Sequence, residues 1–350
     1  MDFNLFNLIR FNYLKIKYFY IIYNMNKLLD EIKKSRDVRE STLQIYKNNL
    51  NSLSKDVLNK PFRSRQFLLK QKDAVIAKLQ EYNQSKRRSM IASILVAISP
   101  KGKNQPQNKN FAKVYKLYNA MLKDENKVYQ DSIADNQKSD KDIANWVNWN
   151  EFLEKRDELG DELKCLGYTN YAKTIKSKCD RQKIIHHLLL SLYTYLPPRR
   201  LEYAEMILYP IGAYQQLGPD KDNRIYYVTN KGKSFIHYGK NATKSQTDNN
   251  IIFNVPRPLY DIIKRYIKLF EIKNGELLLE NALGRKYTSN GLGKELKKTM
   301  KSLFDKEGSV GILRKSFLSN QFGGEIAKQK DLAEKMNHSK AVQQSVYVKI

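Results

Sequence analysis

The sequence predicts a mainly α-helical protein that carries a small antiparallel β-sheet and divides into two domains. Three observations support this fold class. The 350 residues are enough for two domains, each with its own core. Apolar residues recur at helical spacing through the first third of the chain, and three short strand signals lie between helical segments of the second part.

The first domain is expected at 26–125 and to be all-helical. Ser41–Gln44 has the pattern of a capping box, and apolar residues follow it at helical spacing. A second helix is expected around 67–79, a third from Ser85 to Pro100, and a fourth over Phe111–Leu122. The polar stretch 126–141 lacks apolar periodicity and is the expected linker.

The second domain is expected at 142–350, with both helices and strands. Helices are predicted near 143–153, 184–196, 258–270, 292–304, 312–321 and 325–336. The predicted strands are Ile225–Val228, Ser234–Tyr238 and Ile251–Val255, which flank polar turns. Pro197-Pro198 ends the strongly apolar helix over 184–196.

The first 25 residues are treated as an N-terminal extension outside both domains. Charged residues interrupt its apolar stretch, so that no run of about 18 apolar residues forms a membrane span. A helix lying on a membrane surface and an additional segment ahead of a start at Met25 are both compatible with this composition. The chain as a whole is expected to have no membrane partner.

The charge balance points to a polyanionic partner. Lys and Arg number 63 against 36 acidic residues, a net charge of +27. Basic residues near phosphates release counterions on binding, whereas a small-molecule enzyme has no need of such a charge. An AT-rich coding sequence also inflates Lys, along with the abundant Asn, Ile and Tyr, and this remains the alternative explanation.

No cofactor is expected, and neither is a small-molecule substrate. The chain has two cysteines without zinc-site spacing, four scattered histidines, and neither a Walker loop nor a Rossmann fingerprint. The low cysteine content fits a reduced, intracellular compartment. The sequence leaves open whether a DNA-associated protein of this kind resides in the nucleus, the cytoplasm or a virion.

The cluster Lys86-Arg87-Arg88 is a candidate phosphate contact. It lies where the third helix is expected to begin, and free backbone N–H groups and the helix dipole favour phosphate at such a position. A solvated helix end is the alternative interpretation.

The candidate chemistry comes from four residue types, Arg, Lys, His and Tyr, in a fixed order. A metal-free enzyme that breaks a DNA strand reversibly needs a nucleophile, and Tyr can hold the phosphoryl group. Two arginines can clamp the non-bridging oxygens, and a lysine can protonate the leaving 5′-hydroxyl. The chain presents Arg199-Arg200, Arg314, His338 and Tyr347 in an order that suits this reaction.

These segments resemble the tyrosine recombinase, or phage-integrase, family, especially its viral and virophage-type integrases. The resemblance rests on Tyr195–Tyr203, Ile312–Ser316, Met336–Ser339 and Tyr347, and it covers the whole second domain. It implies a helical, SAM-like core-binding domain followed by an α+β catalytic domain. It also implies DNA cleavage and rejoining through a covalent 3′-phosphotyrosyl intermediate.

Carried over to this chain, the resemblance assigns catalytic roles to Arg200, Lys244, Arg314, His338 and Tyr347. The first arginine falls on Arg200 if Leu-Pro-Pro-x-Arg is the anchor, and on Arg199 if Glu202 is the anchor; Arg200 is preferred, with Arg199 as a DNA contact. Lys240 is the second choice for the lysine. Gly311 stands where the family usually has a histidine.

The expected activity is site-specific DNA recombination or integration, performed on double-stranded DNA by a homotetramer spanning two sites. Two alternatives share the fold or the chemistry: a catalytically weakened DNA-binding protein, which Gly311 supports, and a type IB topoisomerase-like enzyme. A metal-dependent integrase is disfavoured because the sequence has neither a zinc-binding head nor a convincing carboxylate triad.

Overall fold

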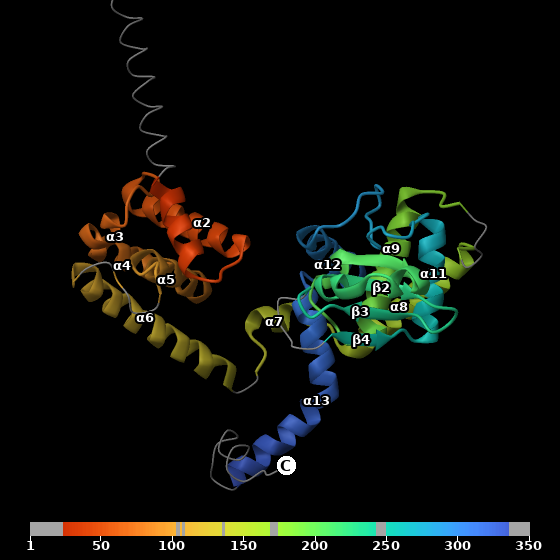
Figure 1. Cartoon of the computed structure of the whole chain (residues 1–350). Coiled ribbons are helices and arrows are strands. Elements are labelled where there is room, and N and C mark those ends of the chain that lie inside the picture. Colours follow the sequence, from red (N-terminus) through yellow and green to blue (C-terminus); the bar gives the residue numbers. More distant parts are fainter. Residues whose placement is uncertain are drawn as a thin grey trace, which may run out of the picture. The chain divides into compact units, whose positions relative to one another are not determined.

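The structure is a computed structural model that describes residues 24–102, 106, 109–134, 137–168, 174–242 and 250–335. The chain forms two compact units, Met1–Gln137 and Lys138–Ile350 (Figure 1). The division between them falls within 126–141, the segment predicted as a linker. Most of the predicted extension, 1–23, lies outside the described residues, whereas Met25 is buried in the core of the first unit.

The first unit is helical, as the apolar spacing predicts. A helix over 24–35 is followed by five others: α2 (Glu40–Leu58), α3 (Gln66–Lys70), α4 (Lys72–Glu81), α5 (Gln84–Ile98) and α6 (Lys109–Ala134). Helix α5 is the central one, because every residue from Ser93 to Ile98 is buried. Asn83 caps it by accepting a hydrogen bond from the backbone N–H of Lys86.

Three details of this unit differ from the prediction. Helix α2 begins at Glu40, so Ser41 lies inside the helix and forms no capping box. The predicted second helix is two helices that meet at Gln71. Helix α6 continues to Ala134, so the first half of the predicted linker is helical. A polar sequence can still be helical when its few apolar residues share one face.

The second unit combines helices with a four-stranded sheet. Its helices are α7 (Asp140–Asn145), α8 (Trp149–Cys165), α9 (Lys178–Tyr195), α10 (Ile211–Gln215), α11 (Arg257–Leu269), α12 (Ser289–Phe304) and α13 (Val310–Lys335), with two 3-10 turns, η1 (Glu202–Glu205) and η2 (Gly218–Asn223). The predicted opening helix is broken between Asn145 and Trp149. The two helices predicted over 312–336 are one continuous helix, α13, which passes through Gly323 and Gly324.

Helix α9 forms the centre of this unit. Its residues Ile184 to Tyr193 are all buried, so the helix is covered on every side. Ser177 caps its start by accepting a hydrogen bond from the backbone N–H of Asp180. The helix ends at Tyr195, and Leu196 is already extended ahead of Pro197, as the residue before a proline usually is.

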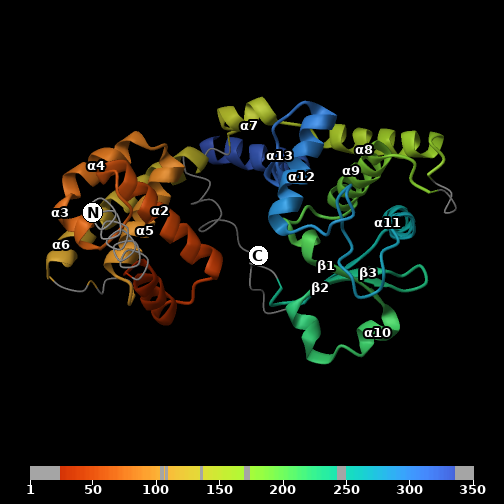
Figure 2. The same ribbon diagram turned by 90° about the horizontal axis from the view of Figure 1, so that it is seen from above.

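The sheet has the strand order β1 (Met206–Pro210), β2 (Ile225–Thr229), β3 (Phe235–Tyr238) and β4 (Ile251–Asn254). Alternate residues face the main core, among them Tyr227 and Tyr238, while Tyr226 and His237 face the other side. Figure 2 shows α10 on the opposite side of the sheet from α9, and Tyr214 of α10 packs on Tyr226 there.

The prediction of a purely antiparallel sheet is wrong. Strand β1 was not predicted, and it pairs in parallel with β2, so the sheet is mixed. The β2–β3 and β3–β4 pairs are antiparallel. Residues 206–210 form a short apolar run without alternation, and periodicity alone does not distinguish such a run from the end of a buried helical segment.

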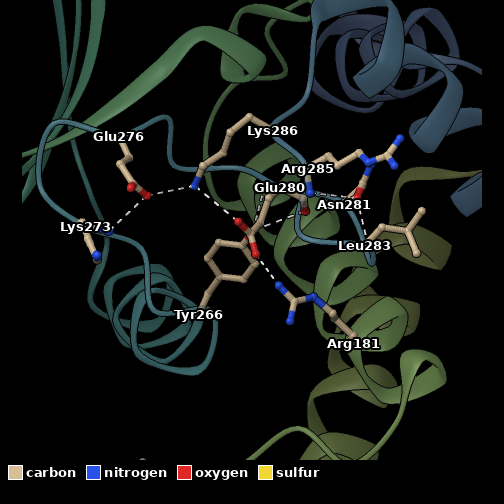
Figure 3. Close-up of polar contacts among 9 residues, drawn as sticks. All are labelled: Arg181, Tyr266, Lys273, Glu276, Glu280, Asn281, Leu283, Arg285 and Lys286. Carbon is tan, nitrogen blue, oxygen red and sulfur yellow. Dashed lines mark hydrogen bonds and ion pairs between the residues drawn. The ribbon is translucent and has the colours of Figure 1, made fainter.

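A buried glutamate joins three parts of the second unit (Figure 3). The side chain of Glu280 pairs with Arg181 of α9, and its other oxygen lies 3.3 Å from Nζ of Lys286. Lys286 also reaches Glu276 at 3.3 Å. The hydroxyl of Tyr266 on α11 accepts a hydrogen bond of 3.0 Å from the backbone N–H of Glu280. This network therefore holds the segment after α11 against α9.

We expect Glu280→Gln to lower the free energy of unfolding of the second unit by about 2–3 kcal/mol, since it leaves the partly buried Arg181 without a counter-charge and leaves Lys286 with Glu276 alone. Both tryptophans of the chain, Trp146 and Trp149, belong to this unit, so tryptophan fluorescence during urea unfolding follows it selectively. The exposed Glu154 of α8 provides the control Glu154→Gln. Equal unfolding midpoints for both variants would contradict a stabilising role of the network.

Candidate functional site

Arg199 and Arg200 lie in the turn that follows α9, where the two prolines stop the helix. Tyr193 donates a hydrogen bond of 2.6 Å to the backbone carbonyl of Arg200, and Tyr203 donates one of 3.3 Å to the carbonyl of Leu192. These two bonds fold the turn back onto the end of α9. The turn is therefore a fixed structure that holds both arginines at the edge of the core.

The two arginines differ in their surroundings. Arg200 is exposed, whereas the side chain of Arg199 is only 20% exposed. The guanidinium of Arg199 lies 4.4 Å from the centroid of the Tyr238 ring and 4.0 Å from the carboxylate of Glu202. Its Nε is buried and has no hydrogen-bond partner among the described residues. Arg199 is thus held in place while part of its donor capacity stays unused.

The tyrosines beneath Arg199 are not candidates for the nucleophile. Burial raises the pKa of Tyr203 to about 12, with Arg199 acting in the opposite direction. Burial likewise raises the pKa of Tyr238, and the neighbouring Tyr203 raises it further. Both phenols therefore stay protonated at neutral pH and serve as an apolar platform for the guanidinium.

Arg314 lies in the first turns of α13. Ile312 and Leu313 beside it are buried in the main core, and Phe317 packs on Trp149 with ring centroids 5.1 Å apart. Arg314 itself is half-buried, and within the described ranges it has no ion pair with a carboxylate. Its neighbour Lys315 is exposed and instead binds Asp142 at 2.6 Å.

Lys240 lies two residues after the end of β3, and its Nζ lies 2.9 Å from the carboxylate of Asp222. Lys244, the first choice for the catalytic lysine, lies outside the described residues, as do His338 and Tyr347. The structure therefore locates Arg199, Arg200, Lys240 and Arg314, and the functional roles of all seven residues stay predictions.

One hydrophobic core fixes the chain on both sides of these placed residues. It contains Leu196 and Tyr203 around the arginine turn, Tyr238 just before Lys240, and Ile312 and Leu313 just before Arg314. Segments more than a hundred residues apart in sequence thus belong to one packed body. The structure does not bring any of the four basic groups into direct contact with another.

The predicted phosphate contacts of the first unit are only partly available. Lys86 is exposed, with its Nζ 3.8 Å from the centroid of the Tyr82 ring. Arg87, in contrast, pairs with Glu125 at 3.2 Å, and Arg88 donates to Asn126 and stacks on Tyr129. All three partners lie on α6, so these arginines also join α5 to α6.

Sequence reasoning missed Asp222 altogether and assigned no role to Tyr238. Tyr238 supports Arg199, and Asp222 pairs with Lys240 from 18 residues away in the sequence. No local pattern marks such a contact, because it depends on β2 and β3 pairing in one particular register. Glu202 was visible from its position three residues after Arg199.

The described ranges contain neither a metal cluster nor a membrane-spanning helix. No group of three or more His, Cys, Asp or Glu side chains in them is arranged to hold a metal ion. No helix in them is long and apolar enough to cross a membrane.

A cavity of about 430 Å³ lies between α8, α9 and α11. His187 of α9 lines it, beside Gly160, with Asp157, Asp261 and Arg265 on the walls. Burial lowers the pKa of His187 to about 4, and Arg265 and Arg156 add to this effect. The imidazole is therefore neutral at physiological pH, and the cavity is separate from the basic groups described above.

Comparison with known proteins gives little further information. No family model matches the sequence, and no curated protein matches it. Among solved structures, the chain is similar to the crystal structure of XerA recombinase, with 9% sequence identity and a TM-score of 0.30, covering 83% of this chain and 81% of that one. These values are too low to assign the chain to a family.

The buried His187 predicts a loss of stability in acid. Its pKa in the folded unit, about 4, lies below the ordinary value of 6.5, so the unfolded chain binds more protons between these two pH values. Stability should thus fall as the pH drops from 6.5 to 4. Between pH 7 and 4.5 the wild type should lose about 2 kcal/mol more than His187→Leu. Urea unfolding followed by tryptophan fluorescence measures this, and parallel pH profiles would refute it.

Proposed function

We propose that the protein is a site-specific DNA recombinase that cleaves and rejoins DNA strands through a 3′-phosphotyrosyl link to Tyr347. The observation that carries the proposal is the shared core of the second unit. It anchors the arginine turn, the end of β3 and the start of α13, which are the segments whose basic residues the reaction needs. Preorganised cations of this kind stabilise the charge that develops on a phosphoryl group during transfer.

The geometry favours Arg199 over Arg200 as the first arginine of the phosphate clamp. A clamp must be held in position before the substrate arrives, and Arg199 rests on Tyr238 beside Glu202. Arg200 is exposed and suits a contact with the DNA backbone. Arg314, which has no carboxylate partner among the described residues, provides the second guanidinium.

The proposed reaction balances without metal or nucleotide. The phenolic oxygen of Tyr347 gives up its proton to solvent and forms a bond to the scissile phosphorus as the bond from phosphorus to the 5′-oxygen breaks. A lysine ammonium, from Lys240 or Lys244, donates the proton that the leaving 5′-oxygen requires. In the second step the 5′-hydroxyl of a partner strand passes its proton to the lysine and attacks the phosphotyrosine, and the released tyrosine takes up a proton from solvent. His338 would contact the phosphate in both steps.

Double-stranded DNA is the proposed partner. The net charge of +27 favours a polyanion, and Lys86 together with Arg200 offers exposed cations on the two units. A homotetramer on two recombination sites follows only from the family resemblance. Integration into a viral or host genome is one use of such a reaction, and excision is another.

Two related functions are the competing candidates. Gly311 stands where a histidine is common in the family, which favours a protein that binds DNA but cleaves it weakly. A type IB topoisomerase-like enzyme would use the same chemistry without a specific site. The experiments below separate these functions from a recombinase.

We expect the protein, incubated with a nicked duplex that bears its recombination site, to form a protein–DNA adduct that survives SDS. Tyr347→Phe should abolish the adduct, because the phenylalanine ring has no nucleophile. Denaturing electrophoresis of labelled DNA measures it, and Tyr195→Phe is a matched control. Absence of an adduct on every site-bearing DNA would rule out the enzyme, and relaxation of site-free supercoiled DNA would instead indicate the topoisomerase.

A second prediction concerns the two neighbouring arginines. Arg199→Ala should slow cleavage by about 10²–10³-fold, the usual effect of removing one preorganised donor. Arg200→Ala should mainly weaken DNA binding and reduce the slope of log K against log salt by about 1. Single-turnover cleavage and salt-dependent binding, measured on both variants, decide which of the two arginines belongs to the phosphate clamp. The reverse pattern would identify Arg200 as the clamp.

A further inference from the structure

The carboxylate of Asp222 joins the two residues that lie on either side of the β3–β4 connection. One oxygen lies 2.9 Å from Nζ of Lys240, and the other accepts a hydrogen bond of 2.8 Å from the side chain of Asn250. Asn250 in turn accepts a hydrogen bond of 2.8 Å from the backbone N–H of Lys240. The three residues therefore form a closed polar triangle.

The backbone around Asp222 strengthens this connection. Its carbonyl accepts a hydrogen bond of 2.8 Å from the N–H of Asn241, and the carbonyl of Arg224 accepts one of 3.0 Å from Gly239. A Cβ atom at Gly239 would lie 2.4 Å from the carbonyl oxygen of Asp222, so only glycine permits this approach. The end of η2 and the end of β3 are thus in direct contact.

The charges around the triangle keep Asp222 ionised. The hydrogen bond from Asn250 and the ion pair with Lys240 lower the pKa of Asp222. His237, which packs on Tyr214 on the side of the sheet away from the main core, also lowers the pKa of Asp222. Lys221, the next residue along η2, has its ammonium 4.6 Å from the centroid of the Tyr214 ring.

The triangle also adjoins the proposed phosphate clamp. Tyr238, on whose ring Arg199 rests, is separated from Lys240 by Gly239 alone. A displacement of the β3 end would therefore alter the position of Lys240 and the support of Arg199. A rigid attachment at this point matters because proton transfer to a leaving oxygen requires hydrogen-bond distance.

We propose that Asp222 is a positioning residue for DNA cleavage: its carboxylate, together with Asn250, holds Lys240 where it can donate a proton to the leaving 5′-oxygen. This inference rests on the proposed recombinase function and selects Lys240 over Lys244. Asp222 does not touch DNA in the proposal. The proton passes from the ammonium of Lys240 to the 5′-oxygen as the bond to phosphorus breaks, and the reverse step returns it.

The test compares two substrates that differ in one atom. A duplex with sulfur in place of the bridging 5′-oxygen has a leaving group whose conjugate thiol has a pKa of about 8.5, so it departs without a proton. Asp222→Asn should cleave the oxygen substrate about 10–100-fold more slowly than wild type and the sulfur substrate at nearly the wild-type rate. Lys240→Ala should give the same pattern, and the double variant should be no slower than Lys240→Ala alone.

Controls separate this role from a loss of folding. Asp220→Asn removes an exposed carboxylate of the same 3-10 turn and should leave both rates unchanged. Asp222→Glu keeps the charge and should restore part of the rate on the oxygen substrate. Equal slowing of Asp222→Asn on both substrates, or no slowing on either, would overturn the inference while wild type still forms its adduct. If wild type forms no adduct with the oxygen substrate and none with the sulfur substrate, the proposed function is overturned, and the inference with it.

Discussion

Burial of helix α9 is the constraint on which the second unit depends. A helix with ten consecutive buried residues has no solvent face, so α8, α11 and the sheet must enclose it. Pro197-Pro198 then ends the helix at the edge of the core, and the hydroxyls of Tyr193 and Tyr203 bind the turn that follows. The position of Arg199 is therefore a consequence of how the core is filled, and the site inherits the rigidity of that core.

The same packing leaves one hydrogen-bond donor of Arg199 unused at the edge of the core. A buried guanidinium nitrogen without a partner is costly, and native structures usually satisfy such groups. Nε of Arg199 lacks a partner among the described residues, and its carboxylate neighbour Glu202 lies at 4.0 Å, beyond good hydrogen-bond distance. An oxyanion that supplied the missing contact would recover part of this cost. This argument applies to any phosphate ligand, and the order of the motifs makes DNA the specific proposal.

The sequence predicted the features that depend on local pattern. Helices α2, α5 and α6 of the first unit, α9 with its proline stop, and three of the four strands follow from apolar spacing and turn residues, whereas the helix over 24–35 was not predicted. Features set by tertiary contact were missed: β1 needed its parallel partner β2, and α13 runs through Gly323-Gly324, where a break had been expected. The site shows the same division. Arg199 and Arg314 stand out in the sequence, whereas the ion pair between Asp222 and Lys240 depends on strand register.

Gly311 stands where the tyrosine recombinase family usually has a histidine, and this difference bears most on the rate of the proposed reaction. The structure shows that the backbone does not require glycine at this position. Its φ is not in the left-handed region, and an added Cβ would meet only the hydroxyl of Ser309, at 3.4 Å. A side chain could therefore begin at this position without displacing the backbone. The absence of a histidine is a property of the sequence and not a demand of the fold. A reaction at this site would then depend more heavily on the arginines and on a well-held lysine, which is the role that Asp222 and Asn250 suit.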